Sequence, residues 1–146
     1  MHEYLENFYG AMADGVNVGD ESDRLYLVWR LAEAPVVAAA EGASLAVDLA
    51  PLRAAGAETV LTVGSDGGPM RTAGTSAAAS AAASTARAVL AQVPADIETL
   101  RRSEPATAWA WRSALREVRV GAIAEGWQVA GIGRDGFYVL VRADGP

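Results

Sequence analysis

The sequence predicts an α+β domain in which a largely antiparallel sheet packs against one long helix. Two apolar segments flank an Asp-Gly turn at 135–136, which is a strong short-range signal for a β-hairpin. Residues 96–126 carry the strongest helical periodicity of the chain. Short runs of β-branched, aromatic and leucine residues recur at 24–31, 58–63 and 87–94. A length of 146 residues fits one domain, 1–146.

The first elements predicted are two antiparallel strands, 4–9 and 24–31, joined by a long loop. That loop, residues 10–23, contains three glycines and four acidic residues, as expected for a hairpin-type connection. Pro35 is expected to end the second strand or to lie on a sheet edge. Two further short apolar runs could be strands: 36–40 and 44–49.

The middle of the chain predicts one strand, a tight turn and a linker. Residues 58–63 read as a strand that is closed by the turn-rich segment 64–69. Residues 71–86 consist almost wholly of Ala, Ser and Thr, with no apolar stripe and no charge pairing. This composition favours a flexible linker over a helix. Residues 87–94 again resemble a strand.

The predicted helix at 96–126 has recognisable start and stop signals. Asp96 is a suitable N-cap, and Glu104-Pro105 after Ser103 suggests that the helix is interrupted and restarts there. Gly126 is expected to end it, before the hairpin of 127–133 and 137–142. At about 100° per residue, one apolar stripe faces the sheet; it consists of Ala108, Trp111, Leu115, Val118 and Ala122.

Composition restricts the chemistry that the chain can perform. The chain has no cysteine and no lysine, so thiolate metal sites, Schiff bases and a P-loop lysine are excluded. Its one histidine, His2, lies near a terminus, so a histidine-based catalytic pair is not expected. A net charge of −6 disfavours nucleic acid, and no apolar run reaches the ~20 residues of a membrane span. We expect a cytoplasmic protein with no metal and no cofactor.

Polar side chains recur at every third position of the 10–23 loop. Closely spaced oxygen ligands can bind Ca²⁺, but the ligand order of an EF-hand is absent. Turn and capping roles in a solvated hairpin are the simpler interpretation. The residues concerned are Asp14, Asn17, Asp20 and Asp23.

Three arginines lie within about 60° of one another on the predicted long helix: Arg112, Arg116 and Arg119. Guanidinium groups bind carboxylate or phosphate bidentately, so this row could hold an anionic substrate. The alternative is a solvated face whose arginines pair with Glu117 or with loop acids. Trp109 and Val120 project away from Trp111, which indicates a helix covered on two faces or by another subunit.

Few residues remain as acid–base groups. Asp96 is better explained as a helix cap, and Tyr138, which alternates with apolar neighbours, as half-buried packing. The catalytic candidates are Asp14, Glu117 and Tyr9. The substrate-binding candidates are Asn17, Asp23, Arg112, Arg116, Arg119 and Trp109.

Two blocks of the chain resemble acyl-CoA N-acyltransferases of the GNAT superfamily. The block at 7–31 contains Tyr-Gly, Ala-Asp-Gly, Asn and Ser-Asp-Arg, in that order, before an apolar strand. The block at 92–131 contains Pro-Ala-Asp and then Trp-Arg-Ser-Ala-Leu-Arg-Glu. Together they cover over half of the chain and resemble the C-terminal half of these enzymes. Residues 35–86 match no part of the family pattern.

The resemblance implies that the acyl-CoA half lies upstream in such relatives. There, a loop of the form Arg/Gln-x-x-Gly-x-Gly/Ala at a helix start holds the pyrophosphate. This chain is therefore expected to be the end of a larger fold standing alone. Residues 53–58 fit most of this spacing, but they lead into a strand and place the carboxylate of Glu58 where phosphate would approach. Residues 71–76 are a second weak candidate. The 10–23 loop would cover the acceptor, with Asp14, Asn17 and Tyr9 as contacts to an amine or alcohol.

Three functions follow from this resemblance. The first is a stand-alone protein that holds a small polar or anionic metabolite between the 10–23 loop and the 96–126 helix, with or without metal-free acid–base catalysis. The second is a non-catalytic subunit of a split acyltransferase, and the third is an acyltransferase with a cryptic CoA site at 71–76. Loss of the front half would expose a sheet edge, so a homodimer or a partner chain is expected.

Overall fold

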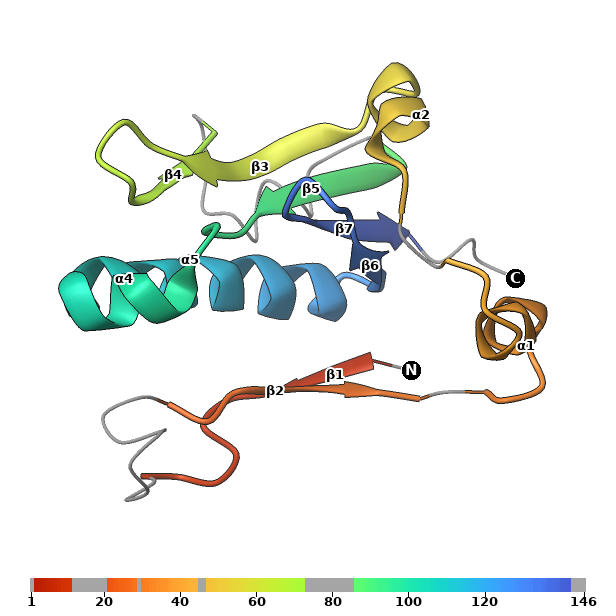
Figure 1. The fold of residues 1–146 in the computed structure, drawn as a ribbon, viewed down its shortest axis with the longest axis horizontal. Coiled ribbons are helices and arrows are strands. Elements are labelled where there is room, and N and C mark those ends of the chain that lie inside the picture. Colours follow the sequence, from red (N-terminus) through yellow and green to blue (C-terminus); the bar gives the residue numbers. More distant parts are fainter. Residues whose placement is uncertain (1, 12–20, 29, 45–46, 73–85, 143–146) are drawn as a thin grey trace. The chain divides into compact units, whose positions relative to one another are not determined.

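The computed structural model describes residues 2–11, 21–28, 30–44, 47–72 and 86–142. The chain divides into two compact units, Met1–Ala43 and Ser44–Pro146, and each is described by itself (Figure 1). The interpretation of 1–146 as one domain stays a prediction.

The first unit contains a two-stranded antiparallel sheet. Strand β1 (His2–Leu5) pairs with β2 (Arg24–Leu27), with Tyr4 opposite Leu25. The predicted pairing is confirmed, but both predicted strands were too long. The chain turns at 6–9, where Asn7 adopts a positive φ of 43°, so the strand predicted at 4–9 cannot continue.

Residues 34–40 form a helix where the sequence suggested strand. Helix α1 (Ala34–Ala40) places Pro35 in its first turn, where the missing N–H costs no hydrogen bond. The prediction that Pro35 ends a strand or lies on an edge was therefore wrong, as was a strand at 36–40. The alanines that follow favour helix by intrinsic propensity.

The second unit is built on a mixed five-stranded sheet in the order β4-β3-β5-β7-β6. Three neighbouring pairs are antiparallel, and β3 and β5 are parallel. The α+β class and the largely antiparallel sheet are confirmed. The strands are β3 (Glu58–Val63), β4 (Pro69–Arg71), β5 (Ala88–Gln92), β6 (Trp127–Ile132) and β7 (Phe137–Arg142).

A short helix precedes the sheet. Helix α2 (Leu49–Ala54) begins at Asp48, whose Oδ1 accepts a hydrogen bond of 3.0 Å from Ala50 N. The strand suggested at 44–49 is wrong at its described end, because Asp48 caps a helix there. Residues 73–85 of the linker predicted at 71–86 lie outside the described residues, and Arg71 belongs to β4.

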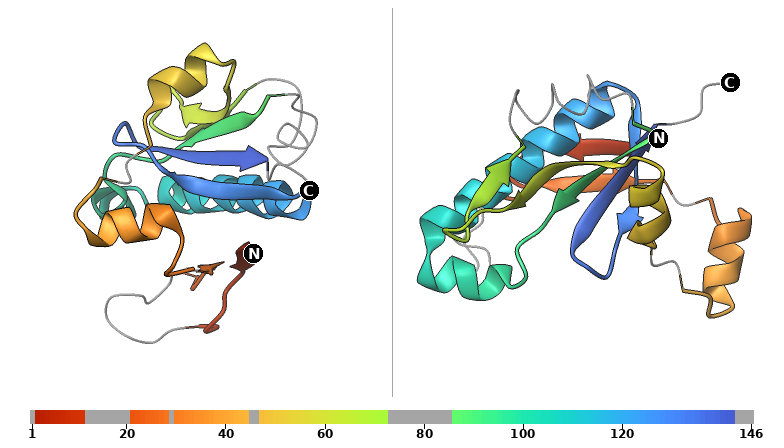
Figure 2. Two further views of the ribbon diagram at one scale, coloured as in Figure 1. Left: turned by 90° about the vertical axis from the view of Figure 1, so that its right-hand side faces the viewer. Right: turned by 90° about the horizontal axis from the view of Figure 1, so that it is seen from above.

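The predicted break in the long helix is confirmed. Helix α4 (Ile97–Ser103) starts at Asp96, which accepts a 2.9 Å hydrogen bond from Thr99 N, and α5 (Pro105–Ala124) restarts with proline in its first turn. Gly126, at φ 81°, follows the end of α5. Helices α5 and α2 cover opposite faces of the sheet (Figure 2).

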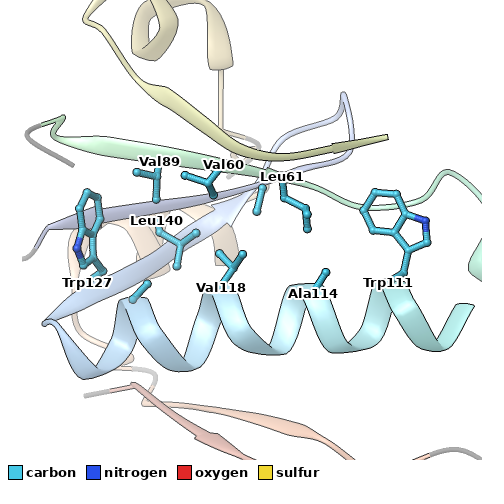
Figure 3. Packing of buried hydrophobic residues seen from close by; sticks show 10 residues of the cluster. Val60, Leu61, Val89, Trp111, Ala114, Val118, Trp127 and Leu140 are labelled. Carbon is cyan, nitrogen blue, oxygen red and sulfur yellow. The ribbon is translucent and has the colours of Figure 1, made fainter. Parts of the chain in front are cut away.

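The main core lies between α5 and the sheet (Figure 3). Four residues of the predicted stripe are buried, Leu115 is half-buried against the same cluster, and Ala114 is an unpredicted member. On the other face, α2 inserts Leu49 against Leu90 and Val139. The sheet and α5 therefore form a rigid platform for side chains on the flanks of the helix.

Candidate functional site

The two flanks of α5 carry opposite charges and contact different strands. On one flank, Glu117 forms an ion pair of 2.5 Å with Arg71 of β4. On the other, the guanidinium carbon of Arg119 lies 4.1 Å from the ring centroid of Tyr138 in β7. Because β3 and β5 separate β4 from β7, these contacts fix the orientation of α5 about its own axis. The side chain of Arg119 therefore lies on the flank of α5 that faces β7.

Arg112, Arg116 and Arg119, hereafter the arginine row, lie on this flank. All three are half-buried. Half-burial lowers the effective dielectric around a charge and strengthens its hydrogen bonds to an anion. Helical periodicity predicted that the three arginines cluster. The contact of Arg119 with Tyr138 of β7 was not predicted.

Tyr138 forms the floor beneath Arg119. It pairs with Ala91 of β5 and with Ile132 of β6, and its half-buried ring packs against the main core. A guanidinium group stacked on an aromatic face keeps its N–H donors in its own plane. The contact therefore restricts the positions that the Arg119 guanidinium can adopt.

The N-terminal part of α5 is anchored to the β3–β4 turn. The fully buried Trp111 donates a hydrogen bond of 2.9 Å from Nε1 to the carbonyl oxygen of Gly67. Trp109, two residues earlier, points away from the sheet and is 63% exposed. Trp111 is therefore a core residue and Trp109 a surface residue, on opposite sides of α5 as the periodicity predicted.

The candidates of the first unit include a hydrogen-bond network at the base of the 10–23 loop. Asp23 accepts hydrogen bonds from Tyr4 Oη at 2.7 Å and from Asn7 N at 3.0 Å. Ser22 is buried, and its Oγ accepts a 2.8 Å hydrogen bond from Tyr9 N. Asp23, predicted to bind substrate, thus also supports the turn at 6–9. Sequence analysis did not identify the role of Asn7 or Ser22.

Tyr9 is exposed, at 61%, on that turn. Its ring meets Phe8 edge-on at 4.9 Å, and the guanidinium of Arg24 lies 5.0 Å from its centroid. Asp14, Asn17 and Asp20 lie outside the described residues, so their roles stay predictions. Within the described ranges, no group of three or more His, Cys, Asp or Glu side chains could hold a metal ion.

The candidate CoA loop at 53–58 does not have helix-start geometry. Arg53 lies at the end of α2, Gly56 follows at φ 85°, and Glu58 begins β3. A helix C-terminus presents carbonyl oxygens, which repel phosphate. Arg71 is paired with Glu117, and 73–76 lie outside the described residues.

Asp96 acts as a helix cap. The hydrogen bond from the Thr99 backbone amide, followed by that from its side chain, lowers the pKa of Asp96 below its usual value of 3.8. A carboxyl group with a lowered pKa is a poor proton donor near neutral pH. This agrees with the prediction that Asp96 caps a helix.

Comparison of the chain with protein families, characterised proteins and solved structures finds no match, so the resemblance to GNAT acyltransferases stays a prediction from the sequence. In the part of the chain that the structure describes, no helix is long and apolar enough to cross a bilayer.

Proposed function

We propose that this protein binds a small anionic metabolite at the arginine row. The resemblance to GNAT-like acyltransferases would give this ligand the place of the acceptor substrate. The observation that carries the proposal is the set of three half-buried arginines on one flank of α5, with the guanidinium carbon of Arg119 over the ring of Tyr138. Guanidinium–oxyanion hydrogen bonds are among the strongest that side chains form.

The alternative, a solvated face, is less consistent with the burial of these residues. Arg101 and Arg102 at the end of α4 are exposed, as expected for arginines that only solvate a helix. The arginines of the row are half-buried in the same unit.

The net charge of the unit that carries the row does not oppose a small anion. Residues 44–146 contain ten acidic residues and ten arginines, so the unit that carries the row is neutral overall. Long-range repulsion from that unit would not oppose the approach of an anion. The absence of cysteine favours the cytoplasm as its compartment.

Chemical-shift titration of the labelled protein tests this proposal, with acetate, succinate and phosphate as probes. We expect millimolar anion to shift the arginine Nε–Hε resonances of the row. The double variant Arg112→Gln/Arg116→Gln should weaken binding at least tenfold. The matched control is Arg134→Gln, which removes an exposed charge from the β6–β7 turn and should change nothing. A row that no anion perturbs would refute the proposal.

A second function is a non-catalytic subunit that completes a split acyltransferase. Trp109 favours it, because an exposed tryptophan is a frequent anchor of protein interfaces. Co-purification with a chain that carries the CoA loop would support this function, and Trp109→Ala should weaken that association. A thermal shift with acetyl-CoA tests for a cryptic CoA site, and no shift at millimolar ligand would remove that possibility.

A further inference from the structure

We propose that the unit Met1–Ala43 binds a basic segment of a partner protein through exposed aromatic rings on its hairpin. The surface concerned, hereafter the aromatic surface, consists of Phe8, Tyr9 and Tyr26, together with Glu3 opposite Tyr26. This inference concerns the first unit by itself and does not depend on the arginine row.

The three rings belong to one continuous surface. Residues that face each other in an antiparallel pair, and residues two apart in one strand, point to the same face, so Glu3, Arg24 and Tyr26 share one face of the sheet. The guanidinium carbon of Arg24 lies 5.0 Å from the centroid of the Tyr9 ring, and that ring meets Phe8 edge-on at 4.9 Å. Arg24 therefore connects the face of Tyr26 to the turn that carries the other two rings.

The first unit leaves an unusual share of its apolar surface exposed. Among the described residues, seven of the eleven large apolar side chains that are exposed belong to this unit. Phe8 is 56% exposed, Tyr9 61% and Tyr26 55%. Aromatic side chains are enriched at protein interfaces, because each ring contributes a large contact area. The aromatic surface therefore has the composition of a binding surface.

Charge decides between the possible partners of this surface. Residues 1–43 contain eight acidic residues and two arginines, so the unit carries a net charge of −6. Both arginines already contact groups of the same unit: Arg24 donates a hydrogen bond of 2.9 Å to the Asp23 carbonyl oxygen, and Arg30 lies 3.7 Å from Glu33. Nucleic acid, an anionic membrane and the same unit of a second copy would all be repelled. A basic protein segment would be attracted, so it is the partner that fits.

The contact of Arg24 with Tyr9 shows which interaction a basic partner would make. A guanidinium or ammonium group over an aromatic face is attracted by the quadrupole of the ring. Glu3 lies directly opposite Tyr26 on the same face, so a partner cation over the Tyr26 ring would also meet a carboxylate. Apolar side chains of the same segment would cover the rest of the rings. The partner segment therefore combines arginine or lysine with apolar residues.

Peptide titration of the labelled protein, followed by NMR, tests this proposal. The probe is a short peptide of alternating arginine and valine, and the comparison peptide has glutamate in place of every arginine. We expect the arginine peptide to shift the amide and ring resonances of Phe8, Tyr9 and Tyr26. The glutamate peptide should leave them unchanged, because both molecules are then acidic. Equal shifts with both peptides would overturn the basic partner.

Two pairs of variants locate the contact. Tyr26→Thr keeps a residue that favours strands but removes the ring, so it should weaken binding of the arginine peptide about fivefold. Its matched control is Met70→Thr at a 53% exposed position of β4, which should change nothing. Glu3→Gln should weaken binding and lower its salt dependence. Glu41→Gln removes the same charge at the end of α1 and should have a smaller effect.

Each remaining outcome decides the proposal. Equal weakening by Glu3→Gln and Glu41→Gln would show attraction by net charge alone and would overturn the aromatic surface. Unchanged binding in Tyr26→Thr would do the same. If Tyr26→Thr disrupts the pairing of β1 with β2, the two glutamate variants still give the answer. Self-association of the wild type that Tyr26→Thr abolishes, measured by light scattering, would replace the basic partner by a second copy of this chain.

Discussion

Different interactions stabilise each of the two units of this chain internally. In Ser44–Pro146, side chains from α2, α5 and four strands form buried apolar clusters on both faces of one sheet. Among the described residues of Met1–Ala43, Ser22 alone is buried. Its N and Oγ donate hydrogen bonds to Asn7 Oδ1, and its Oγ accepts one from Tyr9 N. Hydrophobic burial dominates folding free energy, and a two-stranded hairpin alone is marginal in water. Local stability should therefore differ strongly between the units.

Charge follows the same division. Residues 1–43 contain eight acidic residues and two arginines, so they account for the whole net charge of −6. The second unit is neutral overall, so its acidic residues balance the charge of the arginines on α5. Polar contacts and net charge characterise the first unit, and apolar packing characterises the second.

The largest effect is expected from the core of the second unit. Trp111→Ala removes a fully buried indole and its hydrogen bond to Gly67, so it should lower the free energy of unfolding by about 3–5 kcal/mol. Urea denaturation followed by far-UV circular dichroism measures this. The control, Trp109→Ala, should stay within about 0.5 kcal/mol of the wild type. Equal losses in both variants would contradict the assigned orientation of α5.

In the first unit, the buried hydroxyl should matter more than any apolar side chain. Ser22→Ala leaves the amide of Tyr9 without its acceptor, and should destabilise the turn at 6–9 by about 1–3 kcal/mol. Hydrogen exchange at the Tyr9 amide should accelerate accordingly, while exchange at Val89 in β5 should not change. Ser65→Ala, at an exposed serine of the β3–β4 turn, is the matched control.

A smaller effect is expected from the cap of α4. The pKa of Asp96 is lower in the folded chain than its usual value of 3.8, so its carboxylate stabilises the fold above that pH. This stabilisation should be lost as the pH falls through the lowered folded pKa. A carbon-13 NMR titration should give a midpoint below 3.8 for Asp96. Asp96→Asn keeps a hydrogen-bond acceptor but does not titrate. The free energy of unfolding of this variant should therefore fall less than that of the wild type as the pH is lowered.

The smallest effect is expected from the ion pair on the other flank of α5. Glu117 and Arg71 are partly exposed, so Glu117→Gln should cost at most about 1 kcal/mol, less at high salt. A double-mutant cycle with Arg71→Gln measures the coupling. A coupling of several kcal/mol would show that the pair is shielded from solvent.

Much of the second unit could be predicted from sequence because its signals are local. The Asp-Gly turn, the Glu-Pro restart and the β-branched run of β3 each act over a few residues. Helices α1 and α2 were missed because short apolar runs have no decisive period. The signals that could have identified them were Pro35 in a first turn and Asp48 as an N-cap.

The candidate site was only half predictable for the same reason. Helical spacing groups Arg112, Arg116 and Arg119 without knowledge of the fold. The stacking of Arg119 on Tyr138 depends on where β7 enters the sheet, and spacing along the helix contains no such information. The network of Ser22 with Asn7 likewise joins residues fifteen positions apart.

The order of the strands has a consequence for biosynthesis. Strand β7 follows all the others in sequence, yet it lies inside the sheet between β5 and β6. On the ribosome, β6 has no neighbouring strand from this sheet until residues 137–142 have emerged. The tyrosine beneath Arg119 arrives with those same residues. A nascent chain stalled before them would hold the three strands β4-β3-β5 and an unpaired β6, and would expose the apolar surface that Leu140 later covers.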